Sequence, residues 1–229
     1  MKPQLFQYAA CPFCNKVRSI LEYKGVDFET IEVHPLNKKE ISFSVDYRAV
    51  PIYIDSKGKQ VNDSTPIMRH IDEEFPAPKV FSEDARQAGK DEVWLAWSET
   101  FVKGLPTALY NNLANSLSAF DYITKVGKFS WFEKMKIKYM GAFVMMLVSK
   151  KIAKREKIDQ PEEFVSRMAK EWSEGLEGKP FMGGEKPAAS DLAVYGITRP
   201  VSGLKAGILL EANSAFHAWL TRMKKAVHK

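Results

Sequence analysis

The chain has 229 residues, of which 45% are hydrophobic and 27% are charged. These proportions are typical of a folded globular protein and exclude an intrinsically disordered chain. The formal net charge of +6 is not spread evenly, because residues 133–157 contain eight basic and two acidic side chains and the remaining residues are balanced in charge. The excess positive charge is therefore confined to one segment rather than spread over a nucleic-acid-binding surface, and we expect no nucleic-acid partner.

Two cysteines, Cys11 and Cys14, are the only ones in the chain. Their number excludes a disulfide scaffold and a four-cysteine zinc site. The first eight residues lack the charged-then-apolar layout of a secretory signal. The longest apolar run, Tyr139–Val148, has ten residues, which is about half of the roughly 20 that span a bilayer. We therefore expect a cytoplasmic protein.

The first 77 residues predict an alternation of strands and helices. Apolar residues at helical spacing follow the first strand until Lys24-Gly25 closes the helix, and a turn at residues 55–58 predicts a hairpin. The predicted order is strand, helix, strand, short helix, strand, strand and helix, at residues 4–8, 11–24, 27–33, 37–44, 51–55, 59–62 and 63–75.

Strand signals stop after the linker at residues 75–78, where two prolines interrupt the pattern. Beyond it, apolar residues recur at helical spacing and predict only helices. The helical faces are Val93-Trp97-Phe101 and Phe164-Met168-Trp172, with further helices at residues 134–154, 192–197 and 216–223. We therefore predict an α/β domain at residues 1–77 and an all-α domain at residues 78–229.

The motif Cys11-Pro12-Phe13-Cys14 comes directly after a predicted strand and opens a predicted helix. Free N–H groups and the positive end of the helix dipole favour a thiolate at such a position. Cys14 lies one turn further on and is a candidate resolving thiol. The other interpretations are half of a metal site or two ordinary core cysteines, but the strand-then-helix context favours redox or glutathione chemistry.

Two further pairs follow at helix or strand starts. Val50-Pro51 precedes a strand, where a proline is also common for purely structural reasons. Asp63-Ser64 opens a helix, either as a plain N-cap or as a site where the Ser64 hydroxyl and helix N–H groups bind a carboxylate. Glutathione offers such a carboxylate on its γ-glutamyl end.

The N-terminal half resembles the glutaredoxins and the glutathione transferase superfamily. Over nearly its full length the chain is similar to the type 2 family of microsomal prostaglandin E synthases. The blocks that carry the resemblance are residues 8, 11–18, 48–52, 62–64, 120–123, 138–141, 180–184 and 191–196.

The resemblance implies a thioredoxin-like domain followed by a helical domain, an active site between them, and a homodimer. It implies that Pro51 is cis, so that the Val50 backbone is free to pair with a peptide-like ligand. It also implies haem as a second ligand beside glutathione, although residues 97–110 contain no histidine where a haem-side contact is expected. The implied glutathione site comprises Tyr8, Cys11, Phe13, Cys14, Val50, Pro51, Asp63 and Ser64.

One local departure, one residue with two interpretations and four unassigned histidines remain. Ala188 stands three residues before Asp191, where transferases usually have a Ser or Thr cap. Tyr8 is either a core residue or part of the site. The histidines at positions 34, 70, 217 and 228 show no ligand spacing, so we expect no metal site.

The basic segment at residues 129–157 has three interpretations. A packed helix of the second domain with solvated lysines is favoured. Peripheral contact with an anionic membrane surface is the alternative, and nucleic-acid binding is the least consistent with the pattern.

The sequence thus predicts a glutathione-dependent thiol enzyme with Cys11 as its nucleophile and a hydrophobic or disulfide-containing second substrate. Two reactions stay open: thiol–disulfide exchange, as in glutaredoxins, and isomerisation of a prostaglandin-type endoperoxide (PGH2 to PGE2), which the resemblance implies. The alternative from another class is a non-enzymatic glutathione or glutathione–haem binding protein. A membrane-inserting channel is disfavoured because charged residues interrupt the segment after the cysteine motif.

Overall fold

A mixed four-stranded sheet organises the N-terminal part of the chain in the computed structural model, which describes residues 1–35, 37–126 and 131–228. The strands β1 (Gln4–Gln7), β2 (Glu29–Glu32), β3 (Ile52–Ile54) and β4 (Gln60–Asn62) lie in the order β2-β1-β3-β4. Strand β1 pairs in parallel with β2 and antiparallel with β3, so Phe6 stands opposite both Ile31 and Ile52. Strands β3 and β4 form the predicted hairpin.

Alternation along the strands separates the two faces of this sheet. On one face Phe6, Val33, Ile41 and Ile52 form a buried cluster. Ile41 belongs to a short 3-10 helix, η1 (Lys39–Ile41), within the predicted helical stretch at residues 37–44.

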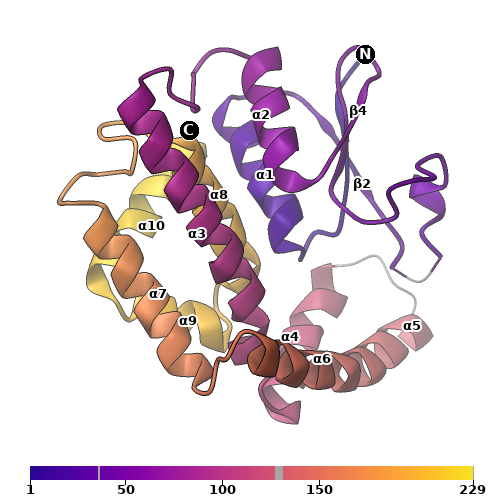
Figure 1. The fold of residues 1–229 in the computed structure, drawn as a ribbon. Helices are drawn as coiled ribbons and strands as arrows, with labels where there is room; N and C mark the ends of the chain where they lie inside the picture. Colours follow the sequence, from indigo (N-terminus) through magenta and orange to yellow (C-terminus); the bar gives the residue numbers. More distant parts are fainter. Residues whose placement is uncertain (36, 127–130, 229) are drawn as a thin grey trace. The chain divides into compact units, whose positions relative to one another are not determined.

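Helices α1 (Pro12–Tyr23), α2 (Ser64–Glu74) and α8 (Ala189–Thr198) pack together in the same part of the molecule (Figure 1). Helix α1 ends at the predicted place, with Lys24 as its C-cap and Gly25 at φ +66. The fully buried Lys24 ammonium lies 2.7 Å from Asp72 of α2 and donates to Phe75 O and Pro78 O. The Lys24 ammonium thereby links the end of α1 to α2 and to the segment that follows α2.

The chain forms two compact units that do not follow sequence order. Unit 1 comprises residues 1–95, 179–200 and 221–229, and unit 2 comprises residues 96–178 and 201–220. Unit 1 therefore contains the sheet together with α8. The division into domains at residues 1–77 and 78–229 stays a prediction.

The second half is helical, as predicted. Its helices are α3 (Ala85–Leu109), α4 (Leu113–Val126), α5 (Trp131–Lys136), α6 (Ala142–Arg155), α7 (Pro161–Gly175), α9 (Lys205–Glu211) and α10 (Ser214–Val227), with a π-helical turn η2 (Ile137–Gly141) and a 3-10 helix η3 (Arg199–Val201). An isolated bridge between Phe181 and Gly184 is the other β pairing recorded among the described residues.

Aromatic residues fill the core of unit 2. Trp172 lies between two neighbours, with ring centroids 5.5 Å from Trp97 and 4.9 Å from Trp219. Phe101 stacks on Trp97 at 5.3 Å and Phe216 packs against Trp219 at 5.2 Å. The predicted helical faces of α3 and α7 therefore meet here through their tryptophans.

Three sequence predictions in this half need correction. Val93, predicted on the buried face of α3, is 66% exposed. The side of this 25-residue helix that is buried at Phe101 is therefore not buried at Val93. The single helix expected at residues 134–154 is α5, η2 and α6 in succession. Helices α4 and α9 were not predicted.

Residues 129 and 130 of the basic segment lie outside the described residues. Among the residues that the structure describes, no helix combines the length and the apolar character needed to cross a membrane.

Candidate functional site

The two cysteines lie at the N-terminal end of α1 with very different accessibility. Cys11 is the N-cap, in an extended conformation (φ −79°, ψ 123°), and is half-buried. Cys14 is in the first turn and is fully buried. Pro12 occupies the first helical position, where its missing N–H leaves no hydrogen bond unmade.

The surroundings shift the pKa values of the two thiols in opposite directions. Cys11 has a lowered pKa, because its sulfur accepts a hydrogen bond from the Cys14 thiol, and this outweighs burial; the backbone N–H groups of Cys14 and Phe13 act in the same direction. Burial is the main cause that raises the pKa of Cys14 well above its usual range, and its hydrogen bond to Cys11 acts in the same direction. The pair therefore favours a thiolate on Cys11 and a thiol on Cys14.

A set of hydrogen bonds fixes the loop that carries Cys11. Its backbone N–H donates to Tyr8 O at 2.9 Å. The Asn15 amide donates to Ala9 O at 2.8 Å and to Cys11 O at 2.9 Å. Glu32 of β2 accepts from the Ala9 N–H at 2.8 Å. This carboxylate also contributes to raising the pKa of both cysteines, so it opposes the effect of the helix start.

Helix α8 supports α1 directly behind the cysteine motif, through Gly196. A Cβ at this glycine would lie 2.5 Å from Asn15 O and 2.6 Å from Lys16 Cα. Ser19, one turn further along α1, donates to Leu192 O at 2.6 Å. Because only glycine allows this close approach, the identity of residue 196 affects where the N-terminal end of α1 lies.

The predicted pair Val50-Pro51 is joined by a cis peptide bond, as the resemblance implied. Val50 is half-buried and packs against the cluster around Phe6, as do Tyr8 and Tyr47. Burial raises the pKa of Tyr8, and the neighbouring Cys11 and Cys14 raise it further. Tyr8 therefore contacts both the core and the cysteine site.

Tyr47 is a neighbour of the site that the sequence analysis missed. Burial is the main cause that raises its pKa, and Asp63 and Cys14 add to it. Tyr47 thus lies near two of the predicted positions, although it is more than thirty residues from the cysteines in sequence. No spacing pattern in the sequence identifies it.

Asp63 and Ser64 open α2 as predicted, but they divide the capping role differently. Asp63 has a positive φ of 67° and its own carboxylate accepts from the Ser64 N–H at 2.6 Å. The Ser64 side chain is buried, and its hydroxyl has no hydrogen-bond partner among the described residues. A buried hydroxyl without a partner is unfavourable in the free protein, and a ligand that accepts or donates a hydrogen bond there gains from it.

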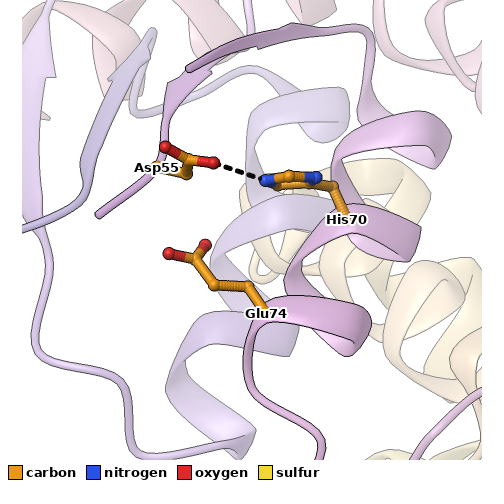
Figure 2. A group of neighbouring side chains, drawn as sticks. All are labelled: Asp55, His70 and Glu74. Atoms are coloured by element: carbon orange, nitrogen blue, oxygen red, sulfur yellow. Dashed lines mark hydrogen bonds and ion pairs between the residues drawn. The ribbon is translucent and has the colours of Figure 1, made fainter. Parts of the chain in front are cut away.

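Asp55, His70 and Glu74 form a second cluster of polar side chains, between the β3–β4 hairpin and α2 (Figure 2). Their potential metal-binding atoms lie within 4.8 Å of one another. Each of these residues has a protein partner. His70 Nε2 is 2.9 Å from Asp55, and Asp55 also accepts from the Lys57 and Lys59 N–H groups. Glu74 accepts from the Tyr53 hydroxyl and the Ser56 N–H. We interpret the cluster as the network that fastens the hairpin to α2.

Asp191 partly compensates for the missing cap at Ala188. Its carboxylate accepts from the Ala188 N–H at 2.9 Å and from the N–H groups of Met182 and Gly183 at 3.1 and 3.2 Å. Ala188 itself has no side-chain acceptor, so the half of the capping box supplied by the N-cap residue is absent. The helix start is retained because the aspartate binds three N–H groups.

Comparison with known proteins agrees with this geometry. The family model for the glutathione S-transferase N-terminal domain matches residues 5–79. Prostaglandin E synthase 2 from Mus musculus is 30% identical over 270 residues, covering 98% of this chain and 70% of that protein, and the Danio rerio protein of the same name is also 30% identical, covering 99% and 71%. Glutathione S-transferase omega-1 from Mus musculus is 28% identical over 45% of this chain and 42% of that protein.

Solved structures share the fold along the whole chain. Glutathione S-transferase III in its apo form matches with a TM-score of 0.66 at 16% identity, covering 99% of this chain and 96% of that one. FzlA from C. crescentus matches with a TM-score of 0.68 at 13% identity, covering 100% and 90%. The chain therefore belongs to the glutathione transferase superfamily, in the part of it that contains the prostaglandin E synthase 2 proteins.

Proposed function

We propose that this chain is a glutathione-dependent thiol enzyme in which Cys11 is the nucleophile and Cys14 donates the hydrogen bond that stabilises the Cys11 thiolate. The observation that supports it is the opposite shift of the two pKa values, lowered at the half-buried Cys11 by its hydrogen bond from Cys14 and raised at Cys14 chiefly by burial. Nucleophilic catalysis needs a sulfur that is both ionised and accessible, and Cys11 meets both conditions better than Cys14.

Glutathione binds, in this proposal, beside Cys11 with its peptide-like backbone against Val50. Its γ-glutamyl end lies at the start of α2, where the unpartnered Ser64 hydroxyl supplies a hydrogen bond. We propose that the exposed Asp63 carboxylate binds the glutathione ammonium group. Phe13 and Tyr8 complete the proposed site, in which the Val50 backbone beside the cis bond to Pro51 pairs with the ligand.

Similarity to the prostaglandin E synthase 2 proteins favours endoperoxide isomerisation as the reaction. In such a step the Cys11 thiolate attacks one peroxide oxygen and the O–O bond breaks. The other oxygen takes up a proton and becomes a hydroxyl. Loss of the proton on the carbon next to the new S–O bond then forms a ketone and releases the thiolate. No net oxidation occurs, and one sulfur is sufficient.

Thiol–disulfide exchange is the second candidate reaction, and the Cys-Pro-Phe-Cys motif favours it. The Cys11 thiolate attacks the glutathione sulfur of a mixed disulfide and the substrate leaves as a thiol. A second glutathione thiolate then attacks the disulfide on Cys11, which releases glutathione disulfide and restores the cysteine. This cycle also needs a single cysteine.

Further partners follow from family membership. We propose that the chain forms a homodimer and that its second substrate is a small hydrophobic molecule or a disulfide. We propose no role for haem, because residues 97–110 contain no histidine where the resemblance places a haem-side contact. No step proposed here involves haem, and a cytoplasmic location stays a prediction.

The test measures alkylation of each cysteine against pH, together with turnover of a glutathione mixed disulfide and of an endoperoxide. We expect Cys11→Ser to abolish turnover and Cys14→Ser to retain a large fraction. In Cys14→Ser the Cys11 alkylation midpoint should stay below about 8.5, the usual thiol pKa. Cys14→Ala should move this midpoint upward relative to Cys14→Ser, because serine retains an O–H donor and alanine does not.

Two results would contradict the proposal. A low midpoint at Cys14 with turnover in Cys11→Ser would reverse the two roles. Full turnover in both serine variants would show catalysis that needs neither cysteine, and no turnover by the parent chain would leave glutathione binding alone, which is the non-enzymatic alternative.

A further inference from the structure

The segment α5–η2–α6 packs against the rest of unit 2 along one side only. Ala142 and Ser149 of α6 are buried, and helix α4 lies against both α6 and η2. At Gly141 the approach is especially close, since a Cβ there would lie 2.4 Å from the Phe120 ring of α4. The opposite side of the segment therefore has no packing partner among the described residues of unit 2.

That opposite side carries a continuous row of large apolar residues. Between 38% and 79% of each side chain is exposed. Their spacing of three or four residues places them on one helical face, in two neighbouring ridges. The residues are Phe132, Met135, Tyr139, Met140, Phe143, Val144, Leu147 and Val148, and we refer to them as the apolar stripe. An exposed apolar patch of this extent marks an interaction site.

Basic residues lie within the apolar stripe and continue the same face beyond its C-terminal end. Lys136 lies between Met135 and Tyr139, one turn before Met140, and Lys150, Lys151 and Lys154 follow the stripe at three- or four-residue steps from Leu147. All four of these lysines are exposed. Residues 134–155 contain seven basic side chains and no acidic one. Of the lysines in this range, Lys138 is the one with an ion pair recorded among the described residues, to Asp121 at 2.8 Å.

We propose that the face formed by the apolar stripe and its flanking lysines binds an anionic lipid surface, with α5 and α6 lying in the plane of the membrane. An apolar centre bordered by cations suits the boundary between acyl chains and negatively charged headgroups, because the long lysine side chains can reach the headgroups from there. The apolar run is too short to span a bilayer, which restricts the contact to the surface.

Charge argues against a second copy of this chain as the occupant. The net charge of +6 resides in this segment, so two copies meeting face to face would bring their excess cations together. An anionic membrane supplies the missing opposite charge. The sequence pattern favoured a packed helix with solvated lysines. In the structure the lysines are exposed, but only the Ala142–Ser149 side of α6 is packed.

The first experiment is co-sedimentation of the full chain with vesicles at physiological salt. We expect most of the protein to pellet with vesicles of phosphatidylcholine and phosphatidylserine, little to pellet with phosphatidylcholine alone, and high salt to reduce binding. Phe143→Ser/Leu147→Ser should weaken binding about tenfold or more, because two exposed apolar side chains no longer enter the lipid. Ile208→Ser, at an apolar residue of α9 that is 63% exposed, is the matched control and should bind normally.

Charge reversal measures the electrostatic contribution to vesicle binding. Lys150→Glu/Lys151→Glu should weaken binding to the anionic vesicles about thirtyfold or more, from the attraction that each basic residue near such a surface contributes. The equivalent pair on α10, Lys224→Glu/Lys225→Glu, changes the net charge equally and should have little effect. Circular dichroism and the Cys11 alkylation rate should be unchanged in all variants, since none of these residues lies at the cysteine site.

Three outcomes would overturn the proposal. These are failure of the parent chain to bind anionic vesicles, equal binding to neutral vesicles, and equal loss in the two charge-reversed variants. Sedimentation equilibrium decides the remaining alternative. If the parent is a dimer without affinity for vesicles, and Phe143→Ser/Leu147→Ser is a monomer, the apolar stripe is an interface between two copies.

Discussion

Ser64 combines complete burial with a hydroxyl that lacks a partner among the described residues. We expect Ser64→Ala to weaken glutathione binding by about 1–3 kcal/mol, the scale of a hydrogen bond to a charged group. The free protein should lose no stability, because the variant removes an unsatisfied buried group rather than a hydrogen bond. Calorimetry and urea unfolding on the same sample measure the two effects. Unchanged affinity would remove Ser64 from the glutathione site.

Glu32 permits a prediction about pH. Its carboxylate lies near both cysteines and favours their neutral forms. Glu32→Gln removes this charge but keeps an oxygen to accept from the Ala9 N–H, so the loop should hold its shape. We expect the midpoint of Cys11 alkylation to move to lower pH. Glu29→Gln, on the same strand, is the control and should leave the midpoint unchanged. A shift to higher pH in Glu32→Gln would show that the hydrogen bond, rather than the charge, is its main effect.

The sequence predicted the asymmetry of Cys11 and Cys14 because a helix start is a local feature. Strand, proline and helix follow one another within a few residues, and the free N–H groups come with them. Glu32 and Tyr47 were not predicted as neighbours of the site. They arrive there through strand pairing and core packing, which no spacing in the chain records.

At the level of elements, α8 approaches the N-terminal end of α1 closely at Gly196, where a larger residue does not fit. In Gly196→Ala the added Cβ would meet backbone atoms of Asn15 and Lys16, which a side-chain rotation cannot relieve. We expect the free energy of unfolding to fall by about 1–3 kcal/mol. Because α1 would be displaced, the Cys11 alkylation rate should also change.

Gly89 provides the matched control for this substitution. It also lies in a helix, α3, but a Cβ there would meet nothing within 4 Å. Gly89→Ala should leave stability equal or slightly higher, because alanine favours helix. Urea unfolding of both variants makes the comparison. Equal stability of the two variants would contradict the role assigned to the α1–α8 contact.

The elements of the α/β part were predicted because their signals are short-range. Alternation, the Asp55–Gly58 turn and the Lys24-Gly25 helix end each occupy a few residues. Helix α9 was missed because seven residues are too few to show a clear period. The misplacement of Val93 has a different origin, since a long helix changes its buried side when its neighbours change.

At the level of the whole molecule, the composition of the two units could not be predicted. Unit 1 includes residues 179–200 and 221–229 together with the N-terminal 95 residues. Contacts between segments this distant in sequence depend on side-chain fit, for example Gly196 against Asn15, and a single sequence does not report such fit. The superfamily was nevertheless predictable, because the cysteine motif and the Asp63-Ser64 pair are local.

The concentration of charge in residues 133–157 also governs how copies of the chain behave toward one another. Outside this segment the numbers of acidic and basic side chains are equal. In solution, mutual repulsion between copies therefore depends on one helical segment, and repulsion of this kind keeps proteins apart. A polyanion or lipid surface that neutralises the segment leaves a molecule with almost no net charge. Such molecules would crowd side by side on that surface with little electrostatic penalty, and their density there would be limited by their size.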